Sequence, residues 1–400
     1  MSSISEHGQA EYEQAPGTRP PAVLQVLPAL VTGGVERSTI DVAKALVQAG
    51  WTAYVTSSGG PMLRELERAG AIHFTLPMQS KNPFVQRANV DRLLDLIDRH
   101  GIDIVHARSR APAWSARAAA RRRALPFVTT FHGTYSAGNP LKRYYNSIMA
   151  KGDRVIANSQ FIAEHVKRIY GVSDGRLVTI PRGLDLARFD PARVSAERMA
   201  DLTAQWRLPD GVPVILLPGR LTRWKGQGVL IDAVAKLAES LGRTNLMCLL
   251  VGDDQGRDDY RAELEAQVDR RKLQGVVRIV GHCRDMPAAY MLADVVVSAS
   301  TDPEAFGRVA AEAQAMGRPV IATDHGGAKE TVLPGVTGWL IPPSDPAALA
   351  LALRQALTID PVRRQELAVA ARTHIAETYT VERMCAATLN VYTELLFPNE

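Results

Sequence analysis

Several features that mark large protein classes are scarce in this sequence of 400 residues. It has only three cysteines, at positions Cys248, Cys283 and Cys385. Their spacing fits neither a metal site nor a disulfide framework, which favours a reducing compartment. No apolar run approaches the roughly 18 residues that a membrane-spanning helix needs. These absences exclude a disulfide-bonded secreted scaffold and a transmembrane protein.

The N-terminal segment also lacks a targeting signal. Residues 1–20 are polar and contain Pro and Gly, without the basic and then apolar stretches of a signal peptide. We expect them to form a disordered tail, and we expect the protein to be cytoplasmic, at most peripheral on the inner face of the inner membrane. The missing signal also disfavours a periplasmic sugar-binding protein.

Basic residues are concentrated in one segment of the first half. Between Arg108 and Arg154, ten Lys and Arg residues face a single acid, Asp153. A solvated helix end would by itself explain the run at residues 121–123, but a whole segment of one sign favours an anionic partner. No aromatic-interleaved binding module accompanies the charge, so an anionic membrane surface or a phosphorylated acceptor fits better than nucleic acid.

The composition is otherwise that of a globular enzyme, with 46% apolar and 22% charged residues, and the length predicts two domains. Short apolar strand patterns alternate with helical ones, which requires parallel sheets with helical crossovers. Strands are predicted at residues 22–27, 102–106, 127–131, 154–157, 214–217, 246–251, 277–280, 295–298 and 319–322. The predicted fold class is α/β, with two Rossmann-like doubly wound domains that face an interdomain cleft.

The alternation is interrupted between residues 173 and 211, which are rich in Gly, Pro and Asp. We therefore place the N-terminal domain at residues 21–190 and the C-terminal domain at residues 191–375. Residues 376–400 contain an amphipathic stretch that we expect to form a helix crossing back onto the first domain. Because ligands of open parallel sheets bind beyond the carboxyl ends of the strands, the site is expected between the two domains.

The most specific motif follows the predicted strand at residues 295–298. It places Glu304 on a loop, Phe306-Gly307-Arg308 at a helix start, and Glu312 about one and a half turns into that helix. Unpaired amides and the helix dipole favour a phosphate there, and Gly307 allows close approach. The two carboxylates suit sugar and ribose hydroxyls without touching each other. A helix-entry acid and a solvent-facing Glu would explain an isolated pair, but the position after a buried strand favours ligand binding.

A second motif, at residues 217–226, also follows a predicted strand. Arg220 as a bidentate fork and Lys225 as a point charge can hold a diphosphate. Fixed cations stabilise the charge that builds on a departing nucleoside diphosphate without a metal ion, each by on the order of a few kcal/mol. Ordinary surface charges are the alternative, which the position at the carboxyl end of a strand disfavours.

Two weaker signals lie at strand ends of the first domain. Gly33 and Gly34 let backbone amides approach a donor or acceptor oxygen, although a tight strand-to-helix turn explains them equally well. His132 follows the strand at residues 127–131 and can hydrogen-bond a sugar hydroxyl beside the reacting carbon. The alternative for His132 is a satisfied core histidine.

Two further stretches suggest other chemistry. The aspartates Asp253, Asp254, Asp258 and Asp259 resemble a Mg²⁺ site, but they follow a strand and are better explained as loop and helix-capping residues. His325 lies in a glycine-rich turn, where we expect backbone amides near the sugar rather than catalysis by the imidazole. No metal site is therefore predicted.

Together these motifs resemble the family 4 retaining glycosyltransferases of GT-B fold. The resemblance rests on Gly33-Gly34-x-Glu36, Gly219-Arg220-Leu221 with Lys225-Gly226, and Glu304-x7-Glu312 with Phe306-Gly307, in order and spacing over residues 22–395. Ala305 stands where this family often has proline. The stretches at residues 27–33 and 251–257 look like those of bacterial enzymes of lipopolysaccharide core assembly.

The resemblance implies an acceptor-binding first domain, a nucleotide-sugar-binding second domain, and no cofactor besides the nucleotide-sugar substrate. It implies that Arg220 and Lys225 hold the diphosphate, that the amides of Phe306, Gly307 and Arg308 complete the phosphate cradle, that Glu304 contacts the sugar and Glu312 the ribose, and that Gly33, Gly34 and His132 face the donor from the first domain. We therefore expect metal-independent transfer of a hexose from a GDP- or UDP-sugar to a lipopolysaccharide-core or other cell-envelope glycan. Mannose is the first candidate for the transferred sugar. The resemblance also implies retention of configuration by front-face substitution, in which the leaving phosphate takes the proton of the acceptor.

Other function classes share parts of the pattern. A nicotinamide dehydrogenase would need a glycine fingerprint in its first turn and a ribose-binding acid after its second strand, and both are missing. A sugar-nucleotide epimerase of the same fold would share the phosphate site without an acceptor. A non-catalytic nucleotide-sugar-binding protein would have no reason to keep two cations and two carboxylates together.

Overall fold

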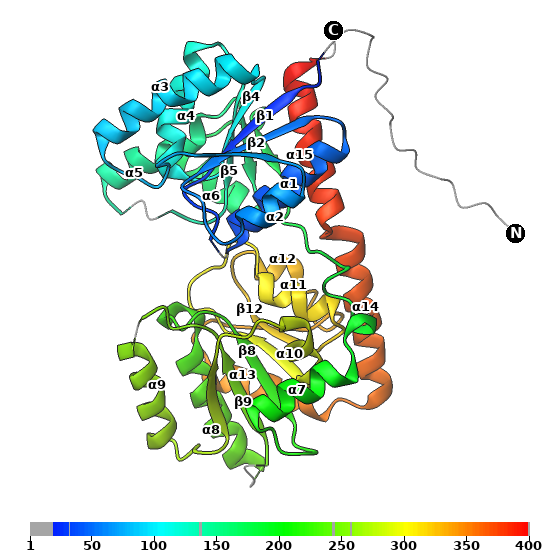
Figure 1. Cartoon of the computed structure of the whole chain (residues 1–400). Helices are drawn as coiled ribbons and strands as arrows, with labels where there is room; N and C mark the ends of the chain where they lie inside the picture. Colours follow the sequence, from blue (N-terminus) through cyan, green and yellow to red (C-terminus); the bar gives the residue numbers. More distant parts are fainter. Residues whose placement is uncertain (1–18, 32, 136–137, 242–244, 257, 399–400) are drawn as a thin grey trace, which may run out of the picture.

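The computed structural model describes residues 19–398, apart from residues 32, 136–137, 242–244 and 257. Residues 1–18 of the predicted tail therefore lie outside the described residues. The described chain forms two lobes, each built on one parallel sheet with helices packed on it (Figure 1). The predicted α/β fold with two doubly wound lobes is confirmed.

The N-terminal lobe has a seven-stranded parallel sheet in the order β3-β2-β1-β4-β5-β6-β7. Its strands are β1 (Ala22–Val26), β2 (Thr52–Ser57), β3 (Ile72–Thr75), β4 (Ile104–Ala107), β5 (Phe127–Phe131), β6 (Arg154–Ala157) and β7 (Leu177–Thr179). Its helices are α1 (Gly34–Gln48), α2 (Leu63–Arg68), α3 (Pro83–His100), α4 (Arg110–Arg122), α5 (Pro140–Asn146), the 3-10 turn η1 (Ser147–Lys151) and α6 (Gln160–Tyr170). The central strands β1, β4 and β5 are buried along their whole length because helices cover both faces, which explains their nearly continuous apolar sequences.

The C-terminal lobe has a six-stranded parallel sheet in the order β10-β9-β8-β11-β12-β13. Its strands are β8 (Val214–Pro218), β9 (Met247–Val251), β10 (Val277–Gly281), β11 (Val295–Ser298), β12 (Val320–Thr323) and β13 (Trp339–Ile341). Its helical segments are η2 (Pro191–Arg193), α7 (Ala196–Trp206), η3 (Arg223–Lys225), α8 (Gln227–Leu241), α9 (Asp258–Arg270), α10 (Met286–Leu292), α11 (Arg308–Ala315), α12 (Ala328–Thr331), α13 (Pro346–Thr358) and α14 (Pro361–Thr378). Within the described parts of the chain, no helix combines the length and apolar character that crossing a membrane requires.

All nine strands predicted from apolar runs are present, with bounds that differ by at most two residues. The missed strands are β2, β3, β7 and β13. Three of these lie at sheet edges, where β3 and β7 keep partly or fully exposed side chains and so lack a continuous apolar run. β2 mixes Thr and Ser with its apolar residues, so it has no continuous apolar run that would indicate a strand.

Two crossings join the lobes. After β7 the chain passes into the second lobe beside the start of the last helix, where the Leu184 amide donates to the Tyr379 carbonyl at 2.7 Å. The last helix, α15 (Val381–Leu396), then lies against α1 of the first lobe (Figure 1). Its Tyr392 hydroxyl is 2.6 Å from Nδ1 of the buried His106. We keep the domain limits at residues 190 and 375 as a proposal.

Glu330 of α12 makes a direct contact between the lobes. Its two carboxylate oxygens accept hydrogen bonds from the amides of Gln160 (2.8 Å) and Phe161 (2.6 Å) at the start of α6. A carboxylate at a helix N-terminus is stabilised by the unpaired amides and the helix dipole. The contact fixes the loop after β6 against the loop after β12, so the carboxyl ends of the two sheets approach each other.

Candidate active site

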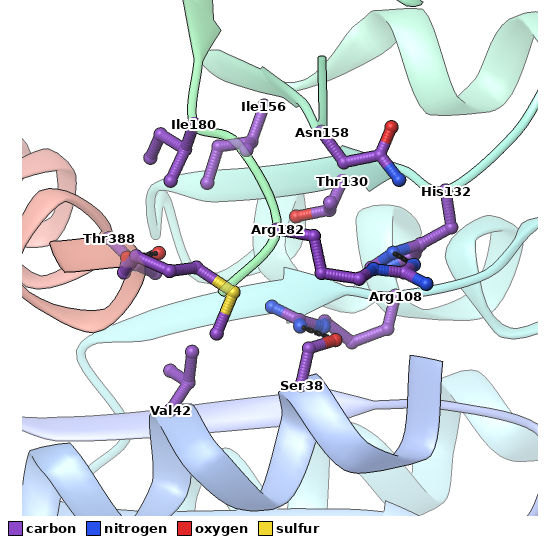
Figure 2. A pocket seen from close by; sticks show the side chains of 11 residues that line it. Ser38, Val42, Arg108, Thr130, His132, Ile156, Asn158, Ile180, Arg182 and Thr388 are labelled. Atoms are coloured by element: carbon purple, nitrogen blue, oxygen red, sulfur yellow. Dashed lines mark hydrogen bonds between the residues drawn. The ribbon is translucent and has the colours of Figure 1, made fainter. Parts of the chain in front are cut away.

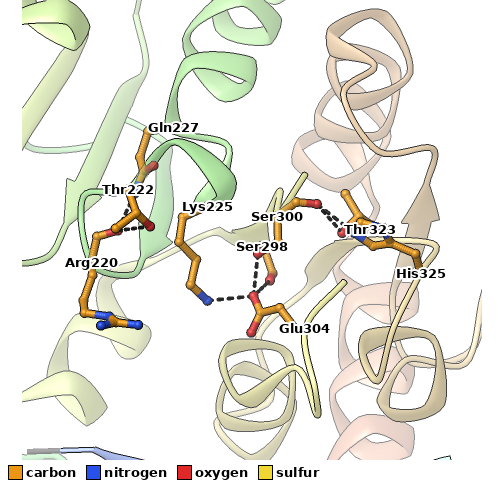
Figure 3. Close-up of polar contacts among 9 residues, drawn as sticks. All are labelled: Arg220, Thr222, Lys225, Gln227, Ser298, Ser300, Glu304, Thr323 and His325. Atoms are coloured by element: carbon orange, nitrogen blue, oxygen red, sulfur yellow. Dashed lines mark hydrogen bonds and ion pairs between the residues drawn. The ribbon is translucent and has the colours of Figure 1, made fainter. Parts of the chain in front are cut away.

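The predicted site residues of the second lobe lie beyond the carboxyl ends of β8 and β11, in the connecting loops, in the turn η3 and in the first turns of α11. Lys225 and Glu304 form an ion pair with 2.8 Å between Nζ and Oε1, and their side chains are only 13% and 11% exposed (Figure 3). The Ser300 hydroxyl donates to the same carboxylate at 2.5 Å. Burial raises the pKa of Glu304, but Lys225 and the serine hydroxyls outweigh it, so the net pKa is lowered and the carboxylate is ionised at neutral pH.

The backbone explains how Lys225 reaches Glu304. Gly226 has a positive φ of 74°, and a Cβ at this position would lie 1.9 Å from the carbonyl oxygen of Ala299. The amide of Thr301 donates to the carbonyl of Trp224 at 2.7 Å and ties the same two loops together. Glycine is therefore required for the loop after β8 to pack on the loop after β11.

Arg220 lies beside this pair in a more open position. Its side chain is exposed and its Nη1 is 3.5 Å from Oε1 of Gln255, while its carbonyl accepts from Gln227 at 3.0 Å. The ends of Arg220 and Lys225 point to the same side of the loop (Figure 3). The two predicted cations are therefore brought together, one fixed by a carboxylate and one at the surface.

The predicted phosphate cradle is the start of α11. Gly307 has φ 80°, and a Cβ there would lie 2.8 Å from the Cα of Ala328, so the turn needs glycine. No side chain caps the helix, which leaves its first amides available to an anion. The Phe306 side chain is buried against the Tyr379 ring, 5.4 Å between centroids, so only its backbone can serve a ligand.

Glu312 is held inside the lobe by two donors. The Tyr290 hydroxyl donates to Oε2 and the Arg308 Nε donates to Oε1, both at 2.7 Å. Glu312 is only 7% exposed, and its carboxylate has other partners than that of Glu304, which bonds to Lys225 and Ser300. The side chain of Arg308 is thus engaged with Glu312, while its amide lies in the first turn of α11.

In the first lobe, His132 is joined to an arginine that sequence reasoning missed. Nη2 of Arg182 is 3.0 Å from Nδ1 of His132 (Figure 2). Because a guanidinium only donates, Nδ1 must accept, so the proton of the neutral imidazole is on Nε2. That Nε2 is buried and has no partner among the described residues. Burial and the nearby charges of Arg108 and Arg182 hold the pKa of His132 well below its ordinary value, so the ring is neutral.

Gly34 leaves room for the guanidinium of the same arginine. It is the first residue of α1, and a Cβ there would lie 2.1 Å from Nη1 of Arg182. Gly33 has φ 179°, an extended conformation open to any residue, and a Cβ there would meet only the Glu36 carboxylate, 2.4 Å away. The two predicted glycines therefore differ, because only Gly34 leaves room for a buried group. Arg182 carries a signal of the same kind as the predicted residues, since it follows the carboxyl end of β7.

A pocket of about 170 Å³ lies where α1, the interlobe crossing and α11 meet, and Asp41 and Arg308 are among its lining residues. Burial raises the pKa of the Asp41 carboxyl from 3.8 to about 6, although Arg37 acts against it. Arg308, whose amide belongs to the predicted cradle, therefore borders a space shared by both lobes.

The aspartates after β9 and His325, for which no metal binding or catalysis was predicted, have structural roles. Asp253 and Asp254 accept hydrogen bonds from the amides of Gln255 (2.7 Å) and Gly256 (3.1 Å). Across the described residues, no three His, Cys, Asp or Glu side chains are arranged to hold a metal ion. His325 Nε2 donates to the carbonyl of Ser300 at 2.8 Å, so the imidazole buttresses the loop that carries Glu304.

Two family models cover most of the chain. The model described as Glycosyltransferase Family 4 matches residues 32–188, and the model described as Glycosyl transferases group 1 matches residues 199–374. A D-inositol 3-phosphate glycosyltransferase of Xylanimonas cellulosilytica is 33% identical over 309 residues, which are 73% of this chain and 72% of that protein. One of Jonesia denitrificans is 32% identical, over 72% of this chain and 71% of its own length.

Solved structures show the same architecture. A glycosyltransferase of Rickettsia africae has a TM-score of 0.88 and 38% identity, covering 96% of this chain and 100% of that one. The Anabaena protein Alr3699/HepE in complex with UDP and glucose has a TM-score of 0.80 and 26% identity, covering 93% and 99%. WaaG, a glycosyltransferase of lipopolysaccharide biosynthesis, has a TM-score of 0.71 over 93% and 99%, and at 19% identity it shares the fold alone. With its strand-end motifs, its two parallel sheets and these relatives, the chain belongs to the family 4 glycosyltransferases of GT-B fold.

Proposed function

We propose that this glycosyltransferase moves a hexose from a UDP-sugar to a hydroxyl of an anionic acceptor, with retention and without a metal ion. The observation that carries the proposal is the shielded Lys225–Glu304 pair, 2.8 Å apart, between the cradle of α11 and Arg220. The HepE relative was solved with UDP-glucose, which supports UDP and glucose as the first donor to test ahead of GDP-mannose.

Each group has a distinct task in this reaction. Lys225 and Arg220 offset the charge that develops on the departing diphosphate, and the first amides of α11 bind its oxygens. Glu304, kept ionised by Lys225, accepts hydrogen bonds from hydroxyls of the sugar. Glu312 accepts from the ribose, with Tyr290 and Arg308 fixing its carboxylate.

The covalent step needs no protein nucleophile. The bond from the anomeric carbon to the β-phosphate oxygen breaks as the acceptor oxygen bonds to the same face of that carbon. The acceptor proton passes to the leaving phosphate oxygen, so charge and atoms balance. The neutral ring of His132, oriented by Arg182, lies beside the reacting carbon and helps to orient the sugar without moving a proton.

The nature of the acceptor follows from charge. The relatives of Xylanimonas cellulosilytica and Jonesia denitrificans are named for D-inositol 3-phosphate, which supports an acceptor that carries a phosphate. A lipopolysaccharide-core or other cell-envelope glycan that carries a phosphate remains within the proposal. The segment from Arg108 to Arg154 contains the short helix α5, on which Leu141 and Tyr144 are 81% and 62% exposed next to Lys142, and we propose it as the contact with an anionic membrane surface.

A binding panel followed by a turnover assay tests the proposal. The full chain is heated with UDP, GDP, UDP-glucose and GDP-mannose, each with and without excess chelator. We expect UDP and UDP-glucose to raise the unfolding temperature most, with no loss in chelator. With UDP-glucose, free UDP should accumulate only when an acceptor such as inositol phosphate is added. UDP release without any acceptor dependence, or an epimerised sugar as the product, would reject the proposal.

A further inference from the structure

A small cavity behind His132 has an unusual polar lining. It has a volume of about 20 Å³, and the lining residues that bear on its chemistry are Ser38, Arg108, Thr130, His132, Asn158 and Arg182. We call it the arginine pocket (Figure 2). It lies at the carboxyl ends of β4 to β7, where ligands of open parallel sheets bind.

Three polar side chains of the arginine pocket have unused hydrogen-bonding atoms. Nε of Arg108, Nε2 of His132 and both amide atoms of Asn158 are buried without a partner among the described residues. Arg108 and Asn158 are each only 3% exposed. Buried polar groups are nearly always hydrogen-bonded, so four unpartnered atoms around one cavity indicate a missing ligand.

The free atoms are almost all donors. Arg108 and Arg182 can only donate, and the bond from Arg182 leaves His132 with its proton on Nε2. Asn158 adds two amide hydrogens. A group that accepts several hydrogen bonds, such as a phosphoryl or carboxylate oxygen, matches the three free donor atoms of this lining, and Oδ1 of Asn158 is the one free acceptor.

The charge balance favours an anion over water. Among the described residues, no carboxylate forms an ion pair with either guanidinium. Two acids, Glu36 and Asp41, act on Arg182, and they do so only through space. Ser38 accepts from Arg108 at 2.7 Å but carries no charge. A water molecule would satisfy the hydrogen bonds of the pocket while leaving both guanidinium groups, one of them fully buried, without a carboxylate in contact.

Size and position restrict how the anion is held. A cavity of about 20 Å³ holds about one water-sized atom group, so it takes one oxygen of a larger anion whose remainder stays outside. Arg182 lies against the start of α1, and its neighbour Gly183 lines the pocket of about 170 Å³ together with Arg308 of the other lobe, so this side of the arginine pocket borders the space between the lobes.

We propose that the arginine pocket binds one oxygen of a phosphoryl or carboxylate group of a substrate, through Arg108, Arg182, His132 and Asn158. The proposal rests on the proposed function only in assigning the anion to a substrate. Two sources share this chemistry, namely the anionic group of the acceptor and the diphosphate of the donor. Four donor side chains that line one cavity, two of them fully buried, give such an oxygen the charge-assisted bonds that strengthen anion binding.

Binding of inorganic phosphate to the full chain, followed at the His132 ring, tests the pocket. The nine histidines are labelled with ¹⁵N, and His132 is assigned by its loss in His132→Asn. Phosphate is titrated at constant ionic strength into the wild type, Arg182→Gln, Arg108→Gln and Arg182→Lys. Arg87→Gln is the matched control, because it removes one exposed charge from α3 of the same lobe.

We expect a saturable shift of His132 in the wild type and in Arg87→Gln. The apparent Kd should be at least about tenfold weaker in Arg182→Gln and in Arg108→Gln, with Arg182→Lys between, because a charge-assisted hydrogen bond is lost. A second titration with saturating UDP separates the sources. Phosphate that still binds beside UDP assigns the pocket to the acceptor, whereas displacement by UDP together with weaker UDP binding in Arg182→Gln assigns it to the donor.

Absence of a His132 shift in the wild type, or equal phosphate binding in Arg182→Gln and Arg87→Gln, would overturn the proposal. Arg182→Lys and Arg108→Gln keep the test decisive if Arg182→Gln does not fold. Phosphate binding requires no turnover, so a chain that shows the shift but transfers no sugar counts against the proposed function alone.

Discussion

Lys225 in the C-terminal lobe and Arg182 in the N-terminal lobe hold comparable places, because each lies just beyond the carboxyl end of a parallel strand, Lys225 after β8 and Arg182 after β7. Lys225 has a carboxylate partner 2.8 Å away and Arg182 has a histidine nitrogen at 3.0 Å. Burial and the charges of Arg308 and Arg108 lower the pKa of Arg182 to about 10, so it still carries its charge at neutral pH. One lobe therefore neutralises its buried cation within the protein, and the other leaves it for a ligand.

The difference teaches how the two cations affect folding. A shielded ion pair fixes both side chains, and removing one member leaves a buried charge without a partner. An uncompensated cation opposes folding, because its lost hydration is not replaced by an opposite charge. Stability and ligand binding are therefore expected to change together in the C-terminal lobe and in opposite directions in the N-terminal lobe.

The largest effect is expected from Lys225→Ala. The variant should lose about 3 kcal/mol of unfolding free energy, because Glu304 stays buried without its counter-charge, and its kcat should fall about 10²- to 10³-fold. The lowered pKa of Glu304 means that its stabilising contribution is present above pH 4.5 and is lost as the pH falls below that value. Urea unfolding at pH 7 and pH 3.5 and initial rates with a UDP-sugar measure both effects.

Arg271→Ala is the control for this experiment. It removes the exposed ion pair of Arg271 with Asp232 in the same lobe, and it should change stability by less than about 1 kcal/mol. A Lys225→Ala variant as stable and as active as Arg271→Ala would remove the pair from its proposed role.

Arg182→Met should have the opposite effect on stability. Removing an uncompensated buried charge while keeping an unbranched side chain should raise the free energy of unfolding by about 1–2 kcal/mol, and added phosphate should no longer stabilise the protein. Urea unfolding with and without phosphate measures both changes. A variant destabilised like Lys225→Ala would show that the guanidinium is compensated within the protein, and the contrast between the lobes would not hold.

Gly34→Ala displaces the same arginine without removing it. The added Cβ would lie 2.1 Å from Nη1 of Arg182, so the guanidinium must shift and its bond to His132 weakens. We expect kcat/KM to fall about tenfold, which corresponds to about 1.4 kcal/mol, with little change in stability. Gly33→Ala is the matched comparison, because its Cβ meets only the end of the flexible Glu36 side chain. Equal losses in the two variants would argue against the role of Arg182.

The sequence predicted the parts of the site that depend on short segments. Strands of continuous apolar residues, the helix start at Gly307 and the loop positions of Lys225 and Glu304 follow from local patterns, and the structure has each of them. The ion pair between Lys225 and Glu304 joins residues 79 positions apart, so it depends on the packing of Gly226 against Ala299. No pattern within either segment reports that packing.

Arg182 was missed for a related reason. An arginine in a Pro-Arg-Gly turn is ordinary in a sequence, and what distinguishes this one is burial, the contact with His132 and the lack of an acidic partner. These are properties of four strand ends brought side by side. Edge strands such as β7 were missed as well, because partial exposure removes the apolar run that marks a buried strand. With β7 unrecognised, Arg182 could not be placed at a strand end.

The smallest expected effect concerns Asp41, a carboxylate on the border between the lobes. The folded protein keeps its proton up to about pH 6, whereas an unfolded chain releases it near pH 3.8. The folded state therefore binds more protons between these values, and the stability contribution of Asp41 falls as the pH rises through this window. Asp41→Asn should remove that fall and gain about 1 kcal/mol at pH 7.5, with almost no gain at pH 4. Urea unfolding at the two pH values measures it, with the exposed Asp201→Asn of α7 as the control. A gain at pH 7.5 no larger than that of Asp201→Asn would mean that Arg37 and Arg308 already compensate the carboxylate, and that the border between the lobes resembles the paired C-terminal lobe rather than the unpaired arginine pocket.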